Sequence, residues 1–266
     1  MKKLGFIGAG NMATAMMSGI IRSGIFSADD IIMSDISADR RNTLREQYGV
    51  ATTSDNTEVV RNAEVFLLAV KPQYYSDVIA EIAPYVTQQQ IIITIAPGQT
   101  LASLAERFGS DKCKIIRTMP NTPAMVGAGM TAVTPNANVT EEELTYACHI
   151  LGGFGLTEVI GEHLMDAAVS VSGSSPAYVF LFIEAMADAA VADGMPRAQA
   201  YQFAAQAVMG SARMVLETGK HPGELKDMVC SPAGTTIEAV RVLEEKGLRS
   251  AVMEAMRACT RKAKGM

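Results

Sequence analysis

Six residues near the start of the chain have the spacing of a dinucleotide-binding turn. Gly8-Ala9-Gly10-Asn11-Met12-Ala13 reads G-x-G-x-x-A and follows a short apolar run, Leu4 to Ile7. In this pattern the first glycine permits a sharp turn, the second leaves room for a pyrophosphate, and the alanine lets helix and strand pack closely. The free N–H groups and the dipole of a helix start favour a bound diphosphate. The sequence therefore predicts a nucleotide site here.

An acidic residue lies where a ribose-binding carboxylate is expected, which favours a nucleotide site over a turn that serves packing alone. A second apolar run, Ile31 to Ser34, ends on Asp35, about twenty residues past the glycine turn. Asp35 favours the free 2′-hydroxyl of NADH and repels a 2′-phosphate. Ser37, Arg40 and Arg41 follow it and could bind that phosphate, so these residues leave NADH and NADPH open.

Two stiff loops follow apolar runs, at the strand ends where open α/β sheets bind ligands. Lys71-Pro72 comes after the run Val65 to Val70. Lys71 could face a phosphate or a nicotinamide, or could be a solvated surface lysine. Pro120-Asn121-Thr122-Pro123 comes after the run Ile115 to Met119. It could hold a ring or an amide, or could be a rigid turn without a ligand.

A third segment, Ser231-Pro232-Ala233-Gly234-Thr235-Thr236, has three hydroxyl groups within six residues and opens a helix. Thr235 and Glu238 have the spacing of a capping box, which alone would account for both. A hydroxyl-rich helix start is also suited to a carboxylate. We therefore predict a capped helix start, with an anion site beside it left open.

Composition is typical of an ordinary globular protein with one or two domains: 266 residues, 48% hydrophobic, with a formal charge of −5. The mild acidity and the lack of a dense Lys/Arg block argue against nucleic acid as a partner. Residues 1–24 have the pattern of a strand and an amphipathic helix, not of a signal peptide. The most apolar stretch, Ala167 to Ile183, is followed by Glu184 and Asp188, so we expect it to fall short of a membrane span.

The chemistry-bearing residue types form no familiar catalytic or metal-binding set. The four cysteines are widely spaced without a C-x-x-C motif, which is typical of reduced thiols and of a cytoplasmic protein. The three histidines have no ligand spacing, so no metal site is expected. An enzyme that transfers hydride can leave the chemistry to nicotinamide and supply mainly orientation and hydrogen bonds.

The first part of the chain alternates strand and helix patterns. Near-continuous apolar strands between helices predict a Rossmann-type, doubly wound parallel sheet that is covered on both faces. The expected strands are Leu4–Ile7, Ile31–Met33, Val65–Val70, Ile91–Ile95, Ile115–Met119, Met130–Thr134 and Thr157–Ile160. The expected helices here include Asp39–Tyr48, Gln73–Tyr85 and Thr140–Leu151.

The second part has only helix patterns. The expected helices are Ser175–Ala192, Arg197–Thr218, Thr236–Glu245 and Leu248–Lys262. The change of pattern predicts a dinucleotide-binding domain over 1–162 and an all-helical domain over 163–266. The segment from Ala177 to Val191 is apolar nearly all round and must be buried. Its own bundle could bury it, but we favour burial by a second subunit.

Taken together, these segments resemble the pyrroline-5-carboxylate reductase family over essentially the whole chain, and the C-terminal half resembles its enterobacterial branch. The motifs that carry the resemblance are Phe6-Ile-Gly-Ala-Gly-Asn-Met12, Ala69-Val-Lys-Pro72, Arg117-Thr-Met-Pro-Asn-Thr-Pro123, Val171-Ser-Gly-Ser-Ser-Pro-Ala-Tyr178, His221-Pro-Gly-Glu-Leu-Lys-Asp227 and Ser231-Pro-Ala-Gly-Thr-Thr236. The resemblance implies NAD(P)H-dependent reduction of (S)-1-pyrroline-5-carboxylate to L-proline. It favours NADPH, with NADH possible, and implies interlocked helical domains in a homodimer or a ring of dimers.

The resemblance also implies roles for individual residues. With Asp35 and Arg40 added from the argument above, the expected cofactor-binding residues are Ile7, Gly8, Ala9, Gly10, Asn11, Met12, Ser34, Asp35, Ser37, Arg40, Asn56, Ala69, Val70, Lys71, Pro72 and Ala96. The nicotinamide is expected beside the backbone of Ile95 to Pro97. The expected substrate-binding residues are Ser231, Thr235 and Thr236, and Thr236 is the expected hydrogen-bond partner of the imine nitrogen.

This chain departs from the family pattern at two positions. The family usually has Ala-Ala-Gly where this chain has Ala96-Pro97-Gly98, and Ser-Pro-Gly-Gly where it has Ser231-Pro232-Ala233-Gly234. The loss of a glycine at Ala233 matters only if that residue takes a positive φ.

Two other functions remain compatible with the sequence. A β-hydroxyacid or imine dehydrogenase would share the two-domain plan and would need a catalytic lysine, for which Lys226 is the candidate near the Ser231 turn. A nucleotide-sensing module would bind NAD(P) and a protein partner without turning over an imine.

Overall fold

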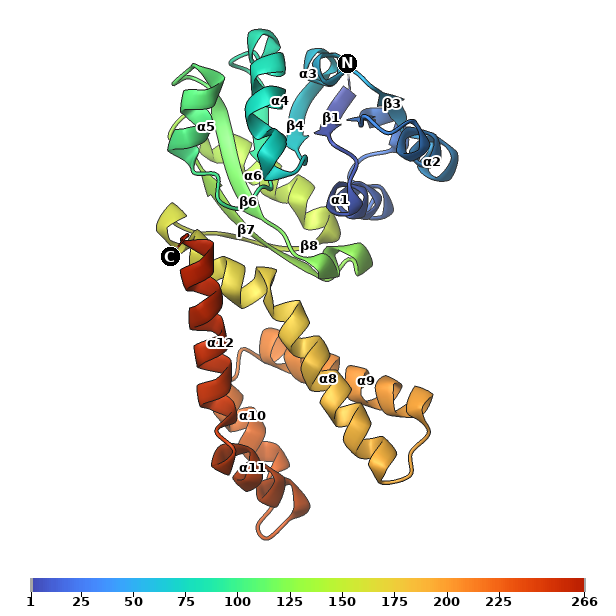
Figure 1. The fold of residues 1–266 in the computed structure, drawn as a ribbon, viewed down its shortest axis with the longest axis vertical. Coiled ribbons are helices and arrows are strands. Elements are labelled where there is room, and N and C mark those ends of the chain that lie inside the picture. The colour runs from blue at the N-terminus through green and yellow to red at the C-terminus, as the bar shows by residue number, and fades with distance from the viewer. Residues whose placement is uncertain (1, 266) are drawn as a thin grey trace. The chain divides into compact units, whose positions relative to one another are not determined.

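The computed structural model describes residues 2–265, which form two compact units (Figure 1). The first unit contains the chain up to Gly173 together with the residues from Thr260 onward, and the second, the helical unit, is Ser174–Cys259. This division comes later than the expected boundary between 162 and 163. The reason is packing, because Met165 is buried against Met119 and Ala132 of the first unit.

The first unit is built on an eight-stranded sheet in the order β3-β2-β1-β4-β5-β6-β7-β8. Its strands are β1 (Lys2–Ile7), β2 (Ile31–Ser34), β3 (Ala51–Thr53), β4 (Ala63–Leu68), β5 (Ile91–Thr94), β6 (Lys114–Met119), β7 (Gly129–Pro135) and β8 (Gly155–Val159). Neighbouring strands are parallel except β6 and β7. The predicted doubly wound, parallel sheet is therefore confirmed, with β6 and β7 as an antiparallel pair within it. The link from β6 to β7 holds only a short 3₁₀ turn, Thr122–Val126, whereas a parallel crossover needs about a dozen residues or more.

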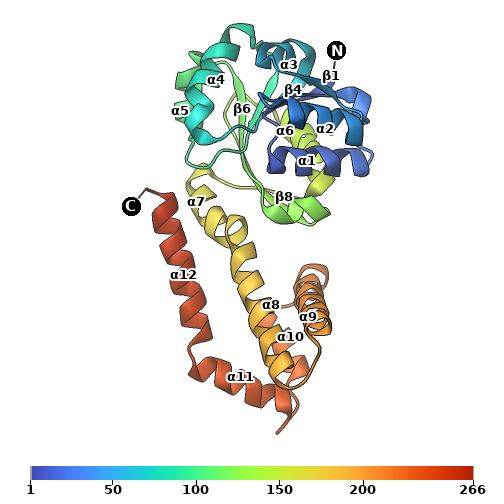
Figure 2. The ribbon, with the colours of Figure 1, turned by 45° about the vertical axis from the view of Figure 1, so that its right-hand side comes forward.

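Helices cover both faces of the sheet, which confirms the doubly wound plan. They are α1 (Asn11–Arg22), α2 (Ala38–Tyr48), α3 (Asn56–Asn62), α4 (Tyr75–Ile82), α5 (Leu101–Phe108), α6 (Glu141–Leu151) and the short α7 (Met165–Ala168). Figure 2 shows the sheet between these helices. One core cluster of buried side chains joins the sheet to α1, α2 and α6, and a second joins it to α3, α4 and α5. Within β4, Leu67 lies in the first cluster and Phe66 in the second, as the alternation of side chains along a strand requires.

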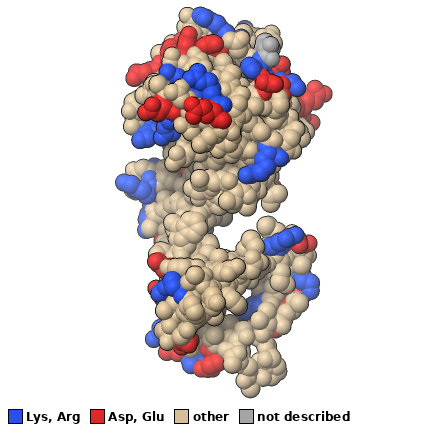
Figure 3. Space-filling model, turned by 90° about the vertical axis from the view of Figure 1, so that its right-hand side faces the viewer, with Lys and Arg blue, Asp and Glu red and all other residues tan. Residues whose placement is uncertain are grey.

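The helical unit contains α8 (Ser175–Ala192), α9 (Arg197–Thr218), α10 (Pro222–Val229), α11 (Thr235–Glu245) and most of α12 (Leu248–Ala263). Within these helices only Ala187, Ala200 and Ala204 are buried among the described residues. Large apolar side chains stay exposed, and Leu181 is 66% and Phe203 67% accessible. Broad areas of this unit carry no charged atoms on the face shown in Figure 3. One copy of the bundle therefore does not bury α8, and the first of the two alternatives is wrong.

The helical run around α8 is longer than expected. Glu162–Ala192 span 31 residues and are long and apolar enough to cross a membrane by length and composition. The run is longer than Ala167–Ile183 because it begins at Glu162 and α8 continues past Glu184 and Asp188. Only 11% of its most apolar window is buried, so this surface needs a cover that the single chain does not provide.

Candidate functional site

The glycine turn has the geometry that the sequence predicts. Gly8 has φ +93°, and a Cβ atom on it would lie 2.9 Å from Val70 Cγ1 and 3.0 Å from the backbone of Ala69. Gly10 precedes α1, no side chain caps that helix, and a Cβ on Gly10 would approach nothing closer than Arg40 Nη1 at 4.0 Å. The turn is thus tight at Gly8 and open at Gly10, which fits a diphosphate at the helix start.

The other predicted residues of this segment differ in how they can contribute. The side chain of Ile7 is fully buried in the core, so only its backbone can reach a ligand. Asn11 is exposed and Met12 is partly buried at the first turn of α1. Ala13 is 1% exposed, in keeping with close packing of helix and strand.

Asp35 connects the ends of β1 and β2. Its two carboxylate oxygens each accept a backbone N–H, from Ala9 and from Ser37, both at 2.9 Å. Arg40 Nη1 donates to the carbonyl of Ala9 at 3.0 Å, and Arg41 Nη1 donates to the carbonyl of Asp35 at 2.6 Å. The Asp35 carboxylate therefore stabilises the glycine turn through its bond to the amide of Ala9. The guanidinium groups of Arg40 and Arg41 lie beside it at the start of α2.

The side chains of Ser34 and Asn56 are in contact next to Asp35. The buried hydroxyl of Ser34 donates to Asn56 Oδ1 at 2.7 Å. Asn56 Nδ2 in turn donates to Glu81 Oε2 at 2.8 Å. Ser34 ends β2 and Asn56 begins α3, and the side chains of both are hydrogen-bonded within the protein.

Two further loops leave the sheet at the same edge, because β1, β4 and β5 are parallel neighbours. Ala69–Pro72 follow β4, and Ile95–Pro97 follow β5. Ala96 is buried, Ala69 and Val70 are partly buried, and Lys71 and Pro72 are exposed. The structure therefore brings all the predicted cofactor-binding residues of the first unit to one edge of the sheet.

A buried tyrosine below these loops was not predicted from the sequence. The hydroxyl of Tyr75 donates to the carbonyl of Leu68 at 2.8 Å and lies 2.8 Å from Thr94 Oγ1. Burial raises the pKa of Tyr75 to about 12, so the phenol stays protonated at neutral pH. A tyrosine at a helix start has the pattern of a core residue, and no sequence signal distinguishes it.

The proline-bracketed loop after β6 is a rigid turn. Asn121 is 8% exposed, its Nδ2 donates to the carbonyl of Ser172 at 3.0 Å, and its Oδ1 accepts from the amide of Met130 at 2.9 Å. These bonds occupy the amide within the first unit. The structure therefore favours a positioning role for Asn121 over direct contact with a ligand.

The helix start at Thr235 differs from the prediction. The N-cap of α11 is Gly234, which has no side chain to cap the helix, and Glu238 accepts from Arg241 instead of closing a capping box. The predicted capping box is wrong because Thr235 is already the first residue inside the helix. The first N–H groups of α11 stay uncapped by side chains, and no other described residue bonds the hydroxyls of Ser231, Thr235 and Thr236. This leaves a polar helix start suited to a carboxylate.

Ala233 takes a left-handed conformation. Its φ is +58°, and it is the one non-glycine residue with positive φ among those described. This conformation costs a residue with a side chain about 1–2 kcal/mol. The departure from glycine at this position is therefore a source of strain beside the helix start.

We expect Ala233→Gly to raise the free energy of unfolding by about 0.5–1 kcal/mol. Glycine removes the strain, and the greater freedom of the unfolded chain offsets only about 0.4–1 kcal/mol of the gain. Urea unfolding measures the change. Ala239→Gly, in the middle of α11, is the matched control and should lower stability by about 1 kcal/mol. A lower urea midpoint for Ala233→Gly would contradict the assigned strain.

Lys226 is paired within its own helix. Its Nζ donates to Asp227 Oδ1 at 2.6 Å, and this bond raises the pKa of Lys226. The lysine is therefore held in its charged form, which is unsuited to accepting a proton from a hydroxyacid.

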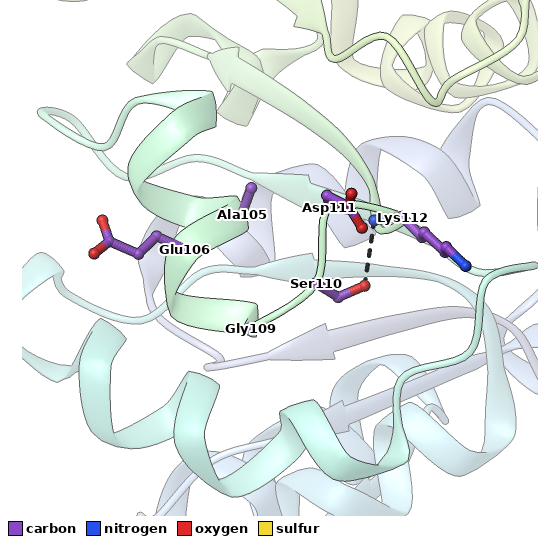
Figure 4. Close-up of a pocket in the computed structure, with 6 residues that line it drawn as sticks. All are labelled: Ala105, Glu106, Gly109, Ser110, Asp111 and Lys112. Atoms are coloured by element: carbon purple, nitrogen blue, oxygen red, sulfur yellow. Dashed lines mark hydrogen bonds between the residues drawn. The ribbon is translucent and has the colours of Figure 1, made fainter.

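A shallow pocket at the end of α5 is not part of the site. Figure 4 shows that Glu106 and Lys112 point away from one another there, and that Ser110 Oγ accepts from the amide of Lys112 at 3.2 Å. Its polar groups do not converge, and it contains none of the predicted site residues. The lining residues are Ala105, Glu106, Gly109, Ser110, Asp111 and Lys112.

Comparison with known proteins matches both units. The family model described as pyrroline-5-carboxylate reductase dimerisation matches residues 162–266, and the one described as NADP oxidoreductase, coenzyme F420-dependent, matches residues 3–98. Pyrroline-5-carboxylate reductase of Escherichia coli (strain K12) is 56% identical over 262 residues, which cover 98% of this chain and 97% of that protein.

Two solved structures extend the match to three dimensions. A pyrroline-5-carboxylate reductase from Coxiella burnetii aligns with a TM-score of 0.93 and 35% identity, covering 99% of this chain and 98% of that one. Pyrroline carboxylate reductase of Plasmodium falciparum with NADP bound aligns with a TM-score of 0.88 and 32% identity, covering 99% and 97%.

Proposed function

The chain belongs to the pyrroline-5-carboxylate reductase family, and from that premise we propose how its residues reduce (S)-1-pyrroline-5-carboxylate to L-proline with NADPH. The observation that carries the function is the 56% identity to the Escherichia coli enzyme over nearly the whole of both chains. This similarity also favours the reductase over a β-hydroxyacid dehydrogenase or a nucleotide-sensing module. The paired state of Lys226 agrees with that choice.

The edge of the sheet in the first unit fits a dinucleotide. When bound, NADPH supplies the hydride that reduces the imine carbon. The uncapped N–H groups after Gly10 bind the diphosphate, since Gly8 permits the tight turn and Gly10 leaves the backbone open. The loops Ala69–Pro72 and Ile95–Pro97 hold the nicotinamide end. The remaining predicted residues, Ile7, Ala9, Asn11, Met12, Ser34 and Asn56, line or support this edge.

The 2′-phosphate of NADPH is bound at the start of α2. Ser37 is the N-cap of that helix, and the guanidinium groups of Arg40 and Arg41 lie beside it. Both oxygens of Asp35 accept backbone N–H groups, so its negative charge is partly satisfied and repels a phosphate less. This arrangement favours NADPH while allowing NADH.

We expect Arg40→Ala to lower kcat/KM for NADPH about tenfold more than for NADH, because a charge-assisted hydrogen bond to a phosphate contributes about 1.5–3 kcal/mol when fully formed. The ratio of the two values is the readout, since Arg40 also bonds Ala9 and its loss loosens the turn for both cofactors. Arg45→Ala, later on the same helix and bonded to Asn42, is the control. Equal losses with both cofactors would place the phosphate elsewhere.

The substrate is held by the start of α11. The uncapped N–H groups of that helix and the hydroxyls of Ser231 and Thr235 bind the carboxylate of the imine. The hydroxyl of Thr236 lies on the same turn and hydrogen-bonds the ring nitrogen, which favours the protonated imine that accepts hydride more readily. These residues supply orientation.

A second copy of the chain covers the apolar surface of the helical unit. The family model for dimerisation spans 162–266, which includes the entire apolar run Glu162–Ala192. A homodimer, or a ring of such dimers, therefore accounts for the exposed side chains of α8 and α9 without a lipid bilayer. The formal charge of −5 argues against nucleic acid, and we place the enzyme in the cytoplasm.

The direct test follows the absorbance of NADPH during incubation with pyrroline-5-carboxylate, and then repeats the assay with NADH. Formation of proline with oxidation of NADPH is the expected result. Binding of NADPH without turnover of the imine would instead support the nucleotide-sensing function.

A further inference from the structure

A chain of hydrogen bonds lies directly under the two loops assigned to the nicotinamide end of the cofactor. β4 ends at Leu68 and β5 at Thr94, where these loops begin. The Tyr75 hydroxyl contacts both strand ends, at 2.8 Å from the Leu68 carbonyl and 2.8 Å from Thr94 Oγ1. Tyr75 and Thr94 are fully buried. The chain of bonds is therefore shielded from water.

The directions of these bonds follow from their atoms. A carbonyl can only accept, so the single phenol hydrogen goes to Leu68 and the hydroxyl of Thr94 donates to the phenol oxygen. Thr94 Oγ1 then accepts from the amide of Ala96 at 3.5 Å, and the Thr94 carbonyl accepts from Thr118 Oγ1 at 2.9 Å. One chain of donors thus runs from the second loop, through the phenol, to the base of the first.

The phenol is not needed to pair the strands. The carbonyl of Leu68 also accepts the amide of Ile95 at 3.3 Å, which continues the ladder between β4 and β5. The Tyr75 hydroxyl adds a bond from the far end of the loop 69–74 back to the residue where that loop begins. Its effect is to limit the conformations of the loop and to fix its spacing from the loop after β5.

We propose that Tyr75 is a positioning residue for the cofactor, whose hydroxyl holds the loops 69–74 and 95–98 at the spacing that binds the nicotinamide end. The inference rests on the proposed placement of NADPH along this edge of the sheet. A loop that is ordered before binding loses less conformational freedom when the ligand arrives, so the affinity for the ligand is higher.

The test is Tyr75→Phe, which keeps the ring in the core and removes only the hydroxyl. We expect the dissociation constant of NADPH, measured by its fluorescence, to rise about fivefold to tenfold, the range for one hydrogen bond. KM for NADPH should rise by a similar factor, and kcat should change less. The ratio of NADPH to NADH affinity should stay unchanged, because the 2′-phosphate is bound at the start of α2.

Ile79→Val is the matched control. Ile79 is fully buried one turn further along α4 and belongs to the same core cluster, but it makes no bond to either loop. Its loss of a methylene lowers stability by a similar amount, about 0.5–1.5 kcal/mol. Weakening of NADPH binding by Ile79→Val as large as that by Tyr75→Phe would overturn the proposal, because the effect would then be general destabilisation.

Thr94→Val provides a second route to the same network. It removes the hydroxyl that joins the phenol to Ala96, so its effect on NADPH binding should not add to that of Tyr75→Phe in the double variant. Full additivity would overturn the connection between the two loops.

The variant Lys71→Ala distinguishes a failure of the proposed role of Tyr75 from a failure of the proposed NADPH site, because Lys71 lies on the loop assigned to the cofactor. Weaker NADPH binding by Lys71→Ala, with Tyr75→Phe indistinguishable from wild type, would overturn the role of Tyr75 alone. Unchanged NADPH binding in both variants, in an enzyme that still reduces the imine, would overturn the placement of the cofactor beside these loops and the inference with it.

Discussion

We expect Thr236→Val to lower kcat/KM for pyrroline-5-carboxylate about a hundredfold, while KM for NADPH stays within about twofold of wild type. Loss of a hydrogen-bonding group that acts on the reacting atoms in the transition state costs about two to three orders of magnitude. Valine has nearly the shape of threonine, and Thr236 lies in the first turn of α11, so the helix is retained. The measurement is steady-state kinetics with each reactant varied in turn.

The control for Thr236→Val lies in the same unit. Thr218→Val removes a hydroxyl that donates to the carbonyl of Met214 at the end of α9, and it should leave kcat/KM unchanged. Thr235→Val should act mainly on KM for the imine, because its hydroxyl is assigned to the carboxylate. A folded Thr236→Val enzyme with the kcat/KM of wild type would falsify the role of this hydroxyl.

We expect Leu181→Asp to separate the subunits and to reduce turnover to near background. Leu181 is 66% exposed in one copy and lies on α8, inside the region that matches the dimerisation family. Its burial by a second copy contributes about 1.5–3 kcal/mol, and a carboxylate in its place would be buried without a partner. The expected result is a monomer by light scattering at micromolar concentration, with the first unit still folded by circular dichroism.

Leu181→Met is the matched control, because it keeps an apolar side chain of similar volume. It should remain a dimer with near-normal activity. A dimeric, fully active Leu181→Asp protein would show that α8 is not the contact between copies, and that another face of the helical unit performs that role.

Local patterns were enough to predict the elements whose ends are set by their own residues. The glycine turn was correct because Gly8 needs a positive φ and has no room for a Cβ, and both facts follow from one short motif. The bounds of α8 and α9 were correct because Pro176 lies at the start of one helix, and Gly219 takes the left-handed C-cap of the other.

The errors came from features that depend on partners distant in sequence. β3 is three residues long and only partly buried, and it is a strand because it pairs with β2. The antiparallel β7 could not be distinguished from a parallel strand, since both patterns are apolar. The predicted capping box failed for a local reason instead, because Gly234 is the cap and Thr235 lies inside the helix.

The hydrogen-bond partners of the side chains in the site could not be predicted from the sequence either. The spacing of Asp35 from the glycine turn predicts a ribose contact, but it gives no sign that each carboxylate oxygen also accepts a backbone N–H, from Ala9 and from Ser37. Tyr75 gave no signal because its role depends on two strand ends that meet only in the fold. Sequence spacing placed these residues at one edge of the sheet, and only the structure shows which of their polar groups are already hydrogen-bonded.

The three small buried residues of the helical unit, Ala187, Ala200 and Ala204, imply that its folding is linked to association by mass action. A bundle that buries so few of its own side chains gains most of its free energy of folding from contacts with a second copy of the chain. Dilution therefore lowers its stability, because it shifts the equilibrium towards separated chains. Its melting temperature then rises with protein concentration, and a newly synthesised chain completes this half of the molecule only after it has encountered another.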